Sequence, residues 1–313
     1  MAFKAKLGDL KSSEKLLKDL FVDLRKKTWK WAKVTKQTPQ ARMGYVGQHL
    51  CSIVTGYEGG RTGARGADIV IPKSDTGEIK TCYRVDQLGS CKKCKAGVSS
   101  WEKICPVKKC KSKDIERKDD SKWLINPKSK QEVKNLFAEK WIYLVLFEFK
   151  DVNKAEDIMV SIFRVSPHNP GFAKVIVDWF INIRAKSKSK AAFNLWPRSP
   201  KFFLMRPEMI YLSKISVGGS ISTKIFPGRD APVTMDIPEL TEWFRSRGFT
   251  IADLVKFCKK HRIVYKGSKS KKDFLLSIEQ WRKKKSMSNK ELAGKLASLF
   301  YDVRIAKHKA LLP

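Results

Sequence analysis

The sequence predicts an α/β protein: a mixed β-sheet flanked by helices, with a small cysteine-rich insertion and a helical C-terminal region. Three observations support this fold class. The segment WIYLVLFEFK, residues 141–150, is an almost continuous apolar run, which is typical of a central strand. Helical and strand patterns alternate on both sides of it. Four cysteines gather in residues 91–110, and from about residue 237 only helical patterns follow.

The first predicted elements are two helices. One is expected over residues 13–35, where apolar side chains recur at helical spacing. Trp29 and Trp31 extend this apolar stripe and are expected in the core. A second helix is expected over residues 42–54. The loop after it, residues 56–66, contains five glycines, which permit a close approach of the backbone to a ligand or phosphate.

Two short strands with charged residues follow the loop, at 67–72 and 78–83, and a turn should fold one back on the other. Alternate residues of a strand share a face, so Glu78 and Lys80 point to the same side. The fold-back brings Asp68 towards Glu78. The sequence therefore predicts a cluster of two carboxylates and one ammonium group.

This cluster has a chemical consequence. Two neighbouring carboxylates raise each other's pKa unless a cation neutralises them. Mg²⁺ binds one or two carboxylates and keeps water molecules and substrate phosphate oxygens. Such an ion polarises a phosphodiester, while Lys80 orients the attacking water and offsets transition-state charge. The pattern favours phosphodiester hydrolysis; the alternative is an exposed hairpin with an ordinary Glu/Lys alternation.

Further strands and a helix complete the predicted sheet. A helix is expected over KQEVKNLFAEK, residues 130–140, a strand over residues 158–165, and a late strand pair near residues 202–215. Residues 191–212 mix basic side chains with aromatic residues and prolines. The aromatic residues are expected in the core, and a loop that enters a DNA groove is the alternative.

The charge of the chain predicts a polyanionic partner. Sixty-five Lys and Arg against 31 Asp and Glu give a formal charge of +34, and 42% hydrophobic residues are too many for a disordered basic tail. Nucleic acid is the favoured partner, because each neutralised phosphate releases counterions. The weaker interpretations of this charge are a basic surface that only keeps the protein in solution and a surface that binds a membrane. No apolar run of about 18 residues and no signal peptide is evident, so a cytoplasmic protein without membrane contact is expected.

The four clustered cysteines predict a zinc site. Cys91, Cys94, Cys105 and Cys110 follow the pattern C-x2-C, ten residues, C-x4-C. Paired thiolates on short turns can close a tetrahedron around Zn²⁺. Four protein ligands leave no open coordination position, so this Zn²⁺ should be structural. Free thiols or an oxidation-prone pair are the alternative, although disulfides are rare in a reducing compartment.

The C-terminal region is basic and helical. Helices are expected over residues 251–261 and 271–282, and residues 254–290 hold 13 Lys or Arg but only two acidic residues. The unit looks like a SAP-type helix-extended-helix module, a small fold that contacts duplex DNA. Its turn and helix N-termini could bind phosphates without reading sequence. A packed helical extension with a solvated basic face is the alternative.

The charged hairpin resembles the PD-(D/E)XK nuclease superfamily, the fold of most type II restriction endonucleases. The matching positions are Asp68, Glu78 and Lys80, and Gln48 is the best match to the Glu or Gln that these nucleases often supply from the preceding helix. The resemblance implies Mg²⁺-dependent cleavage that leaves a 5′ phosphate. Ala67 precedes Asp68 where the motif has proline, which is a departure from the pattern.

With the cysteine spacing and the C-terminal pattern, this resemblance predicts three regions: a restriction-endonuclease-like catalytic core at residues 1–88 and 128–236, a zinc-finger insertion at 89–127 and a basic helical DNA-binding region at 237–313. The expected function is that of a type II restriction enzyme, which acts as a homodimer on double-stranded DNA. The alternatives are a structure-selective repair or recombination nuclease and a non-catalytic zinc protein that binds DNA. The side chains expected to contact DNA are Arg61, Arg65, Lys92, Lys93, Arg198, Lys201, Lys266 and Lys269.

Overall fold

The computed structural model describes residues 3–37, 39, 42–60, 66–117, 119–186, 192–235, 251–265, 270–289, 291–292 and 295. The chain divides into two compact units. The first comprises Met1–Trp123, Tyr143–Arg164 and Met209–Pro232, and the second Leu124–Ile142, Val165–Glu208 and Val233–Pro313. The boundaries expected from the sequence for core, insertion and C-terminal region stay predictions.

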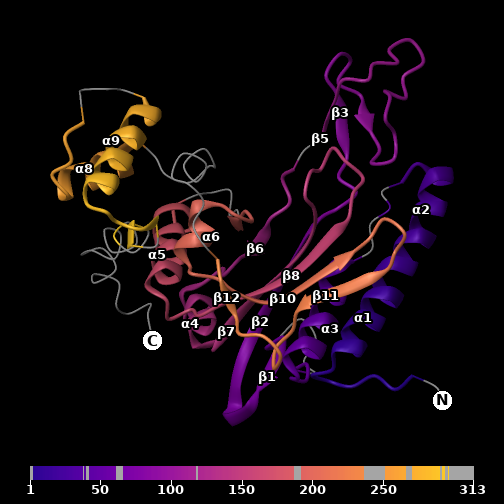
Figure 1. Cartoon of the computed structure of the whole chain (residues 1–313), viewed down its shortest axis with the longest axis horizontal. Coiled ribbons are helices and arrows are strands. Elements are labelled where there is room, and N and C mark those ends of the chain that lie inside the picture. Colours follow the sequence, from indigo (N-terminus) through magenta and orange to yellow (C-terminus); the bar gives the residue numbers. More distant parts are fainter. Residues whose placement is uncertain are drawn as a thin grey trace. The chain divides into compact units, whose positions relative to one another are not determined.

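A mixed sheet forms the centre of the fold, and helices flank it, as the sequence predicts (Figure 1). Its strands follow the order β1-β2-β7-β8-β10-β11. The bounds are Ile69–Ile71 for β1, Asp75–Arg84 for β2, Trp141–Phe149 for β7, Ile158–Val165 for β8, Glu208–Ile215 for β10 and Ile221–Ile225 for β11. Seven consecutive residues of β7 are buried, so its continuous apolar run reflects burial on both faces.

The N-terminal helix is divided where the sequence predicts one helix. Helix α1 (Leu10–Leu17) runs into the π-helical turn η1 (Lys18–Asp23) and then into α2 (Leu24–Thr35). Asp9 starts α1, because its carboxylate accepts a hydrogen bond from the backbone N–H of Ser12 at 2.7 Å. The turn η1 buries Phe21 and Val22, and the ring of Phe21 lies 5.0 Å from that of Phe147 on β7.

Helix α2 contributes little to the core. Among its described residues only Ala32 is buried. The expectation that Trp31 belongs to the core is wrong, since 68% of this residue is exposed. In the sequence, Trp31 continues the apolar spacing of α1. The π-helical turn η1, however, has more residues per turn and so rotates the positions after it relative to the sheet.

The charged hairpin forms, with bounds that differ from the predicted ones. Strands β1 and β2 are antiparallel, and Ile69 pairs with Gly77 and Ile71 with Asp75. A single 3-10 turn, Pro72–Ser74, joins them. Lys73 and Ser74 have left-handed backbone conformations, with φ of 71° and 64°. This tight turn lets the second strand begin at Asp75, three residues earlier than expected, and leaves the first strand short.

Helix α3 (Met43–Thr55) confirms the second predicted helix and packs on β2. Its apolar face buries Leu50, Cys51 and Val54. The absence of a side chain at Gly47 permits the close approach, because a Cβ there would overlap the hydroxyl oxygen of Thr81. Thus helix α3 is held against the strand that carries Glu78 and Lys80.

The cysteine-rich insertion leaves the sheet after β2 and has its own small sheet. Its strands are β3 (Gly89–Cys91), β4 (Gly97–Val98) and β5 (Ile115–Arg117), in the order β4-β3-β5. Arg117 closes the base of the insertion. Its guanidinium donates to the carbonyl oxygens of Gln87 at 3.2 Å, Ser99 at 3.1 Å and Glu102 at 2.7 Å.

The second unit is mainly helical. Its elements are α4 (Lys130–Ala138), α5 (Pro170–Trp179), η4 (Phe180–Arg184), α6 (Pro200–Leu204), α8 (Ile251–Lys260), α9 (Lys271–Lys284), the paired strands β6 (Trp123–Ile125) and β9 (Phe193–Leu195), and β12 (Val233–Thr234). The helices expected over residues 130–140, 251–261 and 271–282 are confirmed. Among the described helices, none is long and apolar enough to cross a membrane.

The late strand pair lies further along the chain than predicted. Ser199 caps α6, since its hydroxyl accepts from the N–H of Phe202 at 3.3 Å, and Phe202 and Phe203 therefore belong to a helix. The actual pair is β10 and β11. The expectation that this aromatic segment fills the core is confirmed for its Phe residues, because Phe193, Phe202 and Phe203 are buried, whereas Trp196 is only partly buried.

Candidate active site and cysteine cluster

Asp68 stands directly before β1, and two donors hold its carboxylate. The side-chain amide of Gln48, on α3, donates to Oδ1 at 2.6 Å. The backbone N–H of Ile79, on β2, donates to Oδ2 at 2.7 Å. Helix α3 and strand β2 therefore orient this carboxylate together. Gln48, which the sequence singles out on the helix before the hairpin, contacts Asp68.

Glu78 and Lys80 follow on β2, on the same side of the strand. Their side chains form an ion pair, and both are about three-quarters buried, with side-chain exposures of 24% and 29%. The pairing of Ile69 with Gly77, continued by one residue, sets Asp68 opposite Glu78. The structure thus brings Gln48, Asp68, Glu78 and Lys80 together at one end of the hairpin.

The electrostatics of this cluster show a local excess of negative charge. Burial, and then the charge of Glu78, raise the pKa of Asp68 above its ordinary value. The N–H of Ile79, the ammonium of Lys80 and the amide of Gln48 oppose this shift without cancelling it. A cation placed between the two carboxylates would relieve the repulsion.

The chain before Asp68 pairs with β1 from its other side. The N–H of Val70 donates to the carbonyl oxygen of Glu58 at 2.9 Å, and the N–H of Gly60 donates to the carbonyl oxygen of Asp68 at 3.3 Å. These bonds fix the backbone of Asp68 between two neighbouring segments. Arg61 and Arg65, which the sequence singles out in this glycine-rich loop, lie outside the described residues.

The four cysteines of the insertion form a compact cluster that can hold a metal ion. Their Sγ atoms all lie within 4.8 Å of one another. Sγ of Cys91 is 3.6 Å from that of Cys110, and Sγ of Cys94 is 3.5 Å from that of Cys105. A regular tetrahedron with Zn–S bonds of about 2.3 Å has edges of roughly 3.8 Å. The observed spacing fits a tetrahedral thiolate site.

Two similar turns present three of these sulfur atoms, those of Cys91, Cys94 and Cys110. In the first, the N–H of Lys95 donates to the carbonyl oxygen of Cys91 at 2.8 Å, and in the second the N–H of Lys111 donates to that of Val107 at 3.2 Å. Lys95 and Lys111 are left-handed, with φ of 62° and 46°. The N–H of Cys94 donates towards Sγ of Cys91 and is the main cause that lowers the pKa of that thiol to about 6.

A buried carboxylate at the root of the insertion was not expected from the sequence. Asp86, 3% exposed, accepts from Nε and Nη2 of Arg25 at 2.7 Å each, from Nε1 of Trp29 at 3.0 Å and from the hydroxyl of Tyr83 at 3.1 Å. Trp29 also packs edge-on against Trp101 of the insertion, with ring centroids 5.9 Å apart. The partners are up to 61 residues away in sequence, so no local pattern marks Asp86.

The remaining side chains predicted to contact DNA have different environments. Lys92 and Lys93 are exposed on the first cysteine turn, and Lys92 pairs with Asp114 at 3.1 Å. Arg198 is exposed, while the ammonium of Lys201 lies 5.2 Å from the ring centroid of Phe193. Burial lowers the pKa of Lys201. Lys266 and Lys269 lie outside the described residues.

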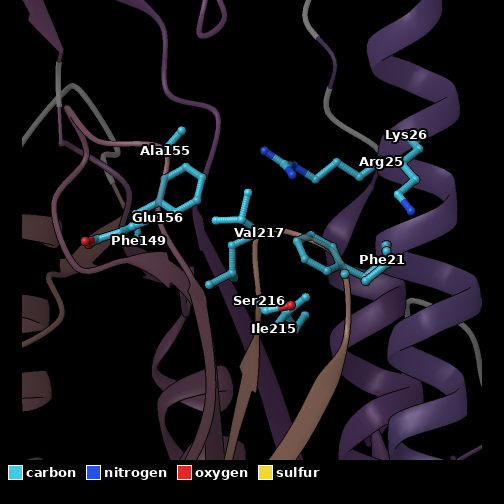
Figure 2. Close-up of a pocket in the computed structure, with 12 residues that line it drawn as sticks. Phe21, Arg25, Lys26, Phe149, Ala155, Glu156, Ile215, Ser216 and Val217 are labelled. Carbon is cyan, nitrogen blue, oxygen red and sulfur yellow. The ribbon is translucent and has the colours of Figure 1, made fainter.

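A pocket opens beside α2 (Figure 2). It is lined by residues of η1 and α2, by the β7–β8 connection and by the β10–β11 turn. Phe21, Phe149, Ile215 and Val217 form apolar walls, and Arg25 enters from α2. None of the predicted site residues lines this pocket, and the guanidinium of Arg25 is engaged by Asp86.

Comparison with known proteins gives one family. The sequence profile of the MamI restriction endonuclease family matches residues 30–241, which is more than half of the chain. The matched region includes the carboxylate cluster and the cysteine insertion. No curated protein and no solved structure shows a significant match.

Proposed function

Because the chain belongs to the MamI restriction endonuclease family, we propose that it is a type II restriction enzyme that cuts double-stranded DNA at a specific site with Mg²⁺ and leaves 5′-phosphate ends. The observation that supports a hydrolytic site at the hairpin is the convergence of Asp68, Glu78, Lys80 and Gln48. The resemblance to the PD-(D/E)XK superfamily rests on the same four side chains.

The donor set fits a hard divalent cation. Asp68 and Glu78 offer carboxylate oxygens, which are the ligands that Mg²⁺ prefers. Gln48 and the N–H of Ile79 each occupy one lone pair of Asp68, and further lone pairs stay available. Burial and, after it, the charge of Glu78 raise the pKa of Asp68, so a bound cation would favour its charged form. A Mg²⁺ ion bound here would polarise the scissile phosphate and lower the pKa of the attacking water.

Lys80 is the proposed catalytic cation of the chain. Its ammonium forms an ion pair with Glu78, one of the two proposed metal-binding carboxylates. When a phosphate enters, Lys80 donates to a phosphate oxygen or to the attacking water and offsets the charge that develops in the transition state. Gln48 acts as a positioning residue, because its amide fixes the carboxylate of Asp68.

The cysteine cluster is proposed to hold one structural Zn²⁺. Four thiolates complete a tetrahedron, so the ion would stabilise the insertion and take no part in hydrolysis. The exposed Lys92 and Lys93, the side chains of Arg198 and Lys201 and the SAP-like helices α8 and α9 would then contact DNA. A homodimer in the cytoplasm, with two active sites related by a two-fold axis, would cut both strands of a palindrome.

Cleavage of plasmid DNA tests this function. Purified protein with Mg²⁺ should give discrete fragments, and the same protein with EDTA should give none. Asp68→Ala should lower the cleavage rate by about 1,000-fold or more, since loss of a bound cation removes several kcal/mol of transition-state stabilisation. Lys80→Ala should lower it by roughly 100- to 1,000-fold.

Asp75→Ala is the matched control. Asp75 begins β2, the strand of Glu78 and Lys80, at the opposite end of the hairpin, where it pairs with Ile71. Its removal changes the net charge as Asp68→Ala does and should leave the rate within about two-fold. Cleavage of branched DNA but not of a plasmid would indicate a structure-selective nuclease instead. Absence of cleavage with every divalent metal would refute the nuclease proposal and leave a zinc protein that binds DNA.

A further inference from the structure

Helix α2 exposes a face whose composition suits a polyanion. The helix has five Lys or Arg and no acidic residue within Leu24–Thr35, and Lys36 caps its C-terminal end. Lys27, Lys30, Trp31 and Val34 are all exposed. Because residues three and four apart adjoin on a helix, these four side chains form one continuous face. We name it the α2 face.

The α2 face is not explained by folding. Trp31 is 68% exposed and Val34 is 74% exposed, and the only described α2 residue that is buried is Ala32. Adjacent exposed Trp and Val side chains between lysines would weaken solubility without any gain in packing. A binding surface that pairs ammonium groups with an apolar contact accounts for all four residues.

The cysteine insertion continues the basic surface next to α2. Residues 89–117 contain nine Lys or Arg and three acidic residues. Asp114 is paired with Lys92, and Glu102 accepts the N–H of Ser99 at 2.9 Å. A Zn²⁺ ion with four thiolates would add two negative charges, and the insertion would still be cationic.

Contacts join helix α2 to the base of the cysteine insertion. Asp86 accepts from Arg25 and Trp29 of the helix, and it lies at the root of the insertion. The rings of Trp29 and Trp101 are in contact. The ammonium of Lys33 lies 5.6 Å from the ring centroid of Trp29. The helix is therefore anchored by its inner side, and the α2 face is left outward.

We propose that the α2 face binds the sugar-phosphate backbone of duplex DNA beside the cysteine insertion, with Lys27 and Lys30 at phosphates and Trp31 against deoxyribose. This inference rests on the proposed function for the identity of the polyanion. The contact is independent of base sequence, so it positions the duplex for the catalytic hairpin and does not choose the cleavage site. Charge complementarity commits the surface to DNA, whereas a second protein copy would repel an all-basic helix.

The test measures DNA affinity as a function of salt. In buffer without Mg²⁺ and without a chelator, so that cleavage is prevented and zinc stays in the insertion, fluorescence anisotropy of a labelled duplex should give a linear fall of log K with log salt concentration. Lys27→Ala/Lys30→Ala should reduce the magnitude of this slope by about 2, at roughly 0.9 per lost phosphate contact. Trp31→Ala should weaken binding several-fold without a change of slope, because it removes an uncharged contact.

The control removes two lysines from another exposed helix. Lys130→Ala/Lys134→Ala on α4 makes the same change of charge at exposed positions and should leave the slope within about 0.3. Lys27→Gln/Lys30→Gln, which keeps longer side chains and helix propensity, guards against a folding defect and should reproduce the slope of the alanine variant.

An unchanged slope in both Lys27/Lys30 variants would overturn the proposal. Sedimentation data in which Trp31→Ala converts a dimer to a monomer would also overturn it, since the α2 face would then be a subunit interface. These outcomes are separate from cleavage. A wild-type protein that cuts plasmid DNA while the slope is unchanged refutes only the α2 face. A slope that falls by 2 in a protein that never cuts refutes only the nuclease.

Discussion

Gly47 of helix α3 lies so close to Thr81 of β2 that a Cβ at residue 47 would overlap the Thr81 hydroxyl and lie 3.0 Å from its Cβ and Cγ2. The next residue on the helix is Gln48, which holds the Asp68 carboxylate. Close packing of helix on strand therefore places the amide of Gln48.

Gly47→Ala should therefore affect the site as well as the fold. The added methyl group must push α3 from β2, at a cost of about 1–3 kcal/mol in the free energy of unfolding. It also moves Gln48, and we expect cleavage to slow by roughly ten- to 100-fold, because a displacement of about 1 Å at a catalytic group has effects of that size. Thermal unfolding and single-turnover cleavage measure the two effects.

Gly44→Ala is the control for Gly47→Ala. Gly44 is on the same helix, and an added Cβ meets nothing within 4 Å. Alanine there should stabilise the helix by up to about 1 kcal/mol and leave cleavage unchanged. Equal effects of the two substitutions on cleavage would contradict a role for the contact with Thr81.

Asp68→Asn should stabilise the metal-free protein while it abolishes cleavage. The folded-state pKa of Asp68 is raised above 3.8 by burial and by Glu78. The folded state therefore binds the proton more tightly than the unfolded state does, and stability falls as the pH rises from 3.8 through the folded pKa. Above that window the wild type carries an unfavourable charge that Asn lacks.

Melting curves at several pH values without added Mg²⁺ measure this effect. At neutral pH we expect the Tm of Asp68→Asn to exceed that of the wild type by roughly 1–3 °C, since a partly exposed carboxylate contributes no more than about 1 kcal/mol. The difference should vanish below pH 3.8 and should reverse in excess Mg²⁺, which stabilises only the wild type. A lower Tm for Asp68→Asn at neutral pH without added Mg²⁺ would refute an unfavourable charge at this partly buried site.

Loss of a cysteine ligand should release zinc and unfold the insertion. Cys105 is buried within the cluster, and Cys105→Ser should reduce the metal content from about one Zn²⁺ per chain to near zero, as elemental analysis would measure. Cys258→Ala, at a buried thiol of α8, should retain the zinc. Equal zinc contents in both variants would show that these four sulfur atoms are not the ligands.

Asp86→Ala should be among the more destabilising single substitutions in the first unit. It leaves the guanidinium of Arg25 and the donors of Trp29 and Tyr83 without their acceptor, and loss of one partner of a buried ion pair costs about 3–5 kcal/mol. Asp119→Ala provides a comparison at an exposed carboxylate paired with Arg84, where about 0–1 kcal/mol is expected. Urea unfolding compares the two.

Much of the protein follows from local sequence. Residues 141–149 and 158–165 could be read as strands, because burial selects long apolar side chains whatever their neighbours are. The cysteine spacing and the E-x-K of β2 are local patterns too. Cysteines on a short turn, and alternate residues of one strand, lie close together because few residues separate them. The fold class, the compact cysteine cluster and the meeting of Asp68 with Glu78 were therefore accessible from the order of residues.

Tertiary structure alone decided the features that depend on long-range contacts. Asp86 meets Arg25 over 61 residues, and Gly47 matters because Thr81 packs on it. Trp31 has the spacing of a core residue, yet η1 turns it into solvent beside two lysines. Such placements depend on how helices and strands pack in three dimensions. The order of apolar and charged residues along the chain does not show whether a given side chain faces the sheet or the surface.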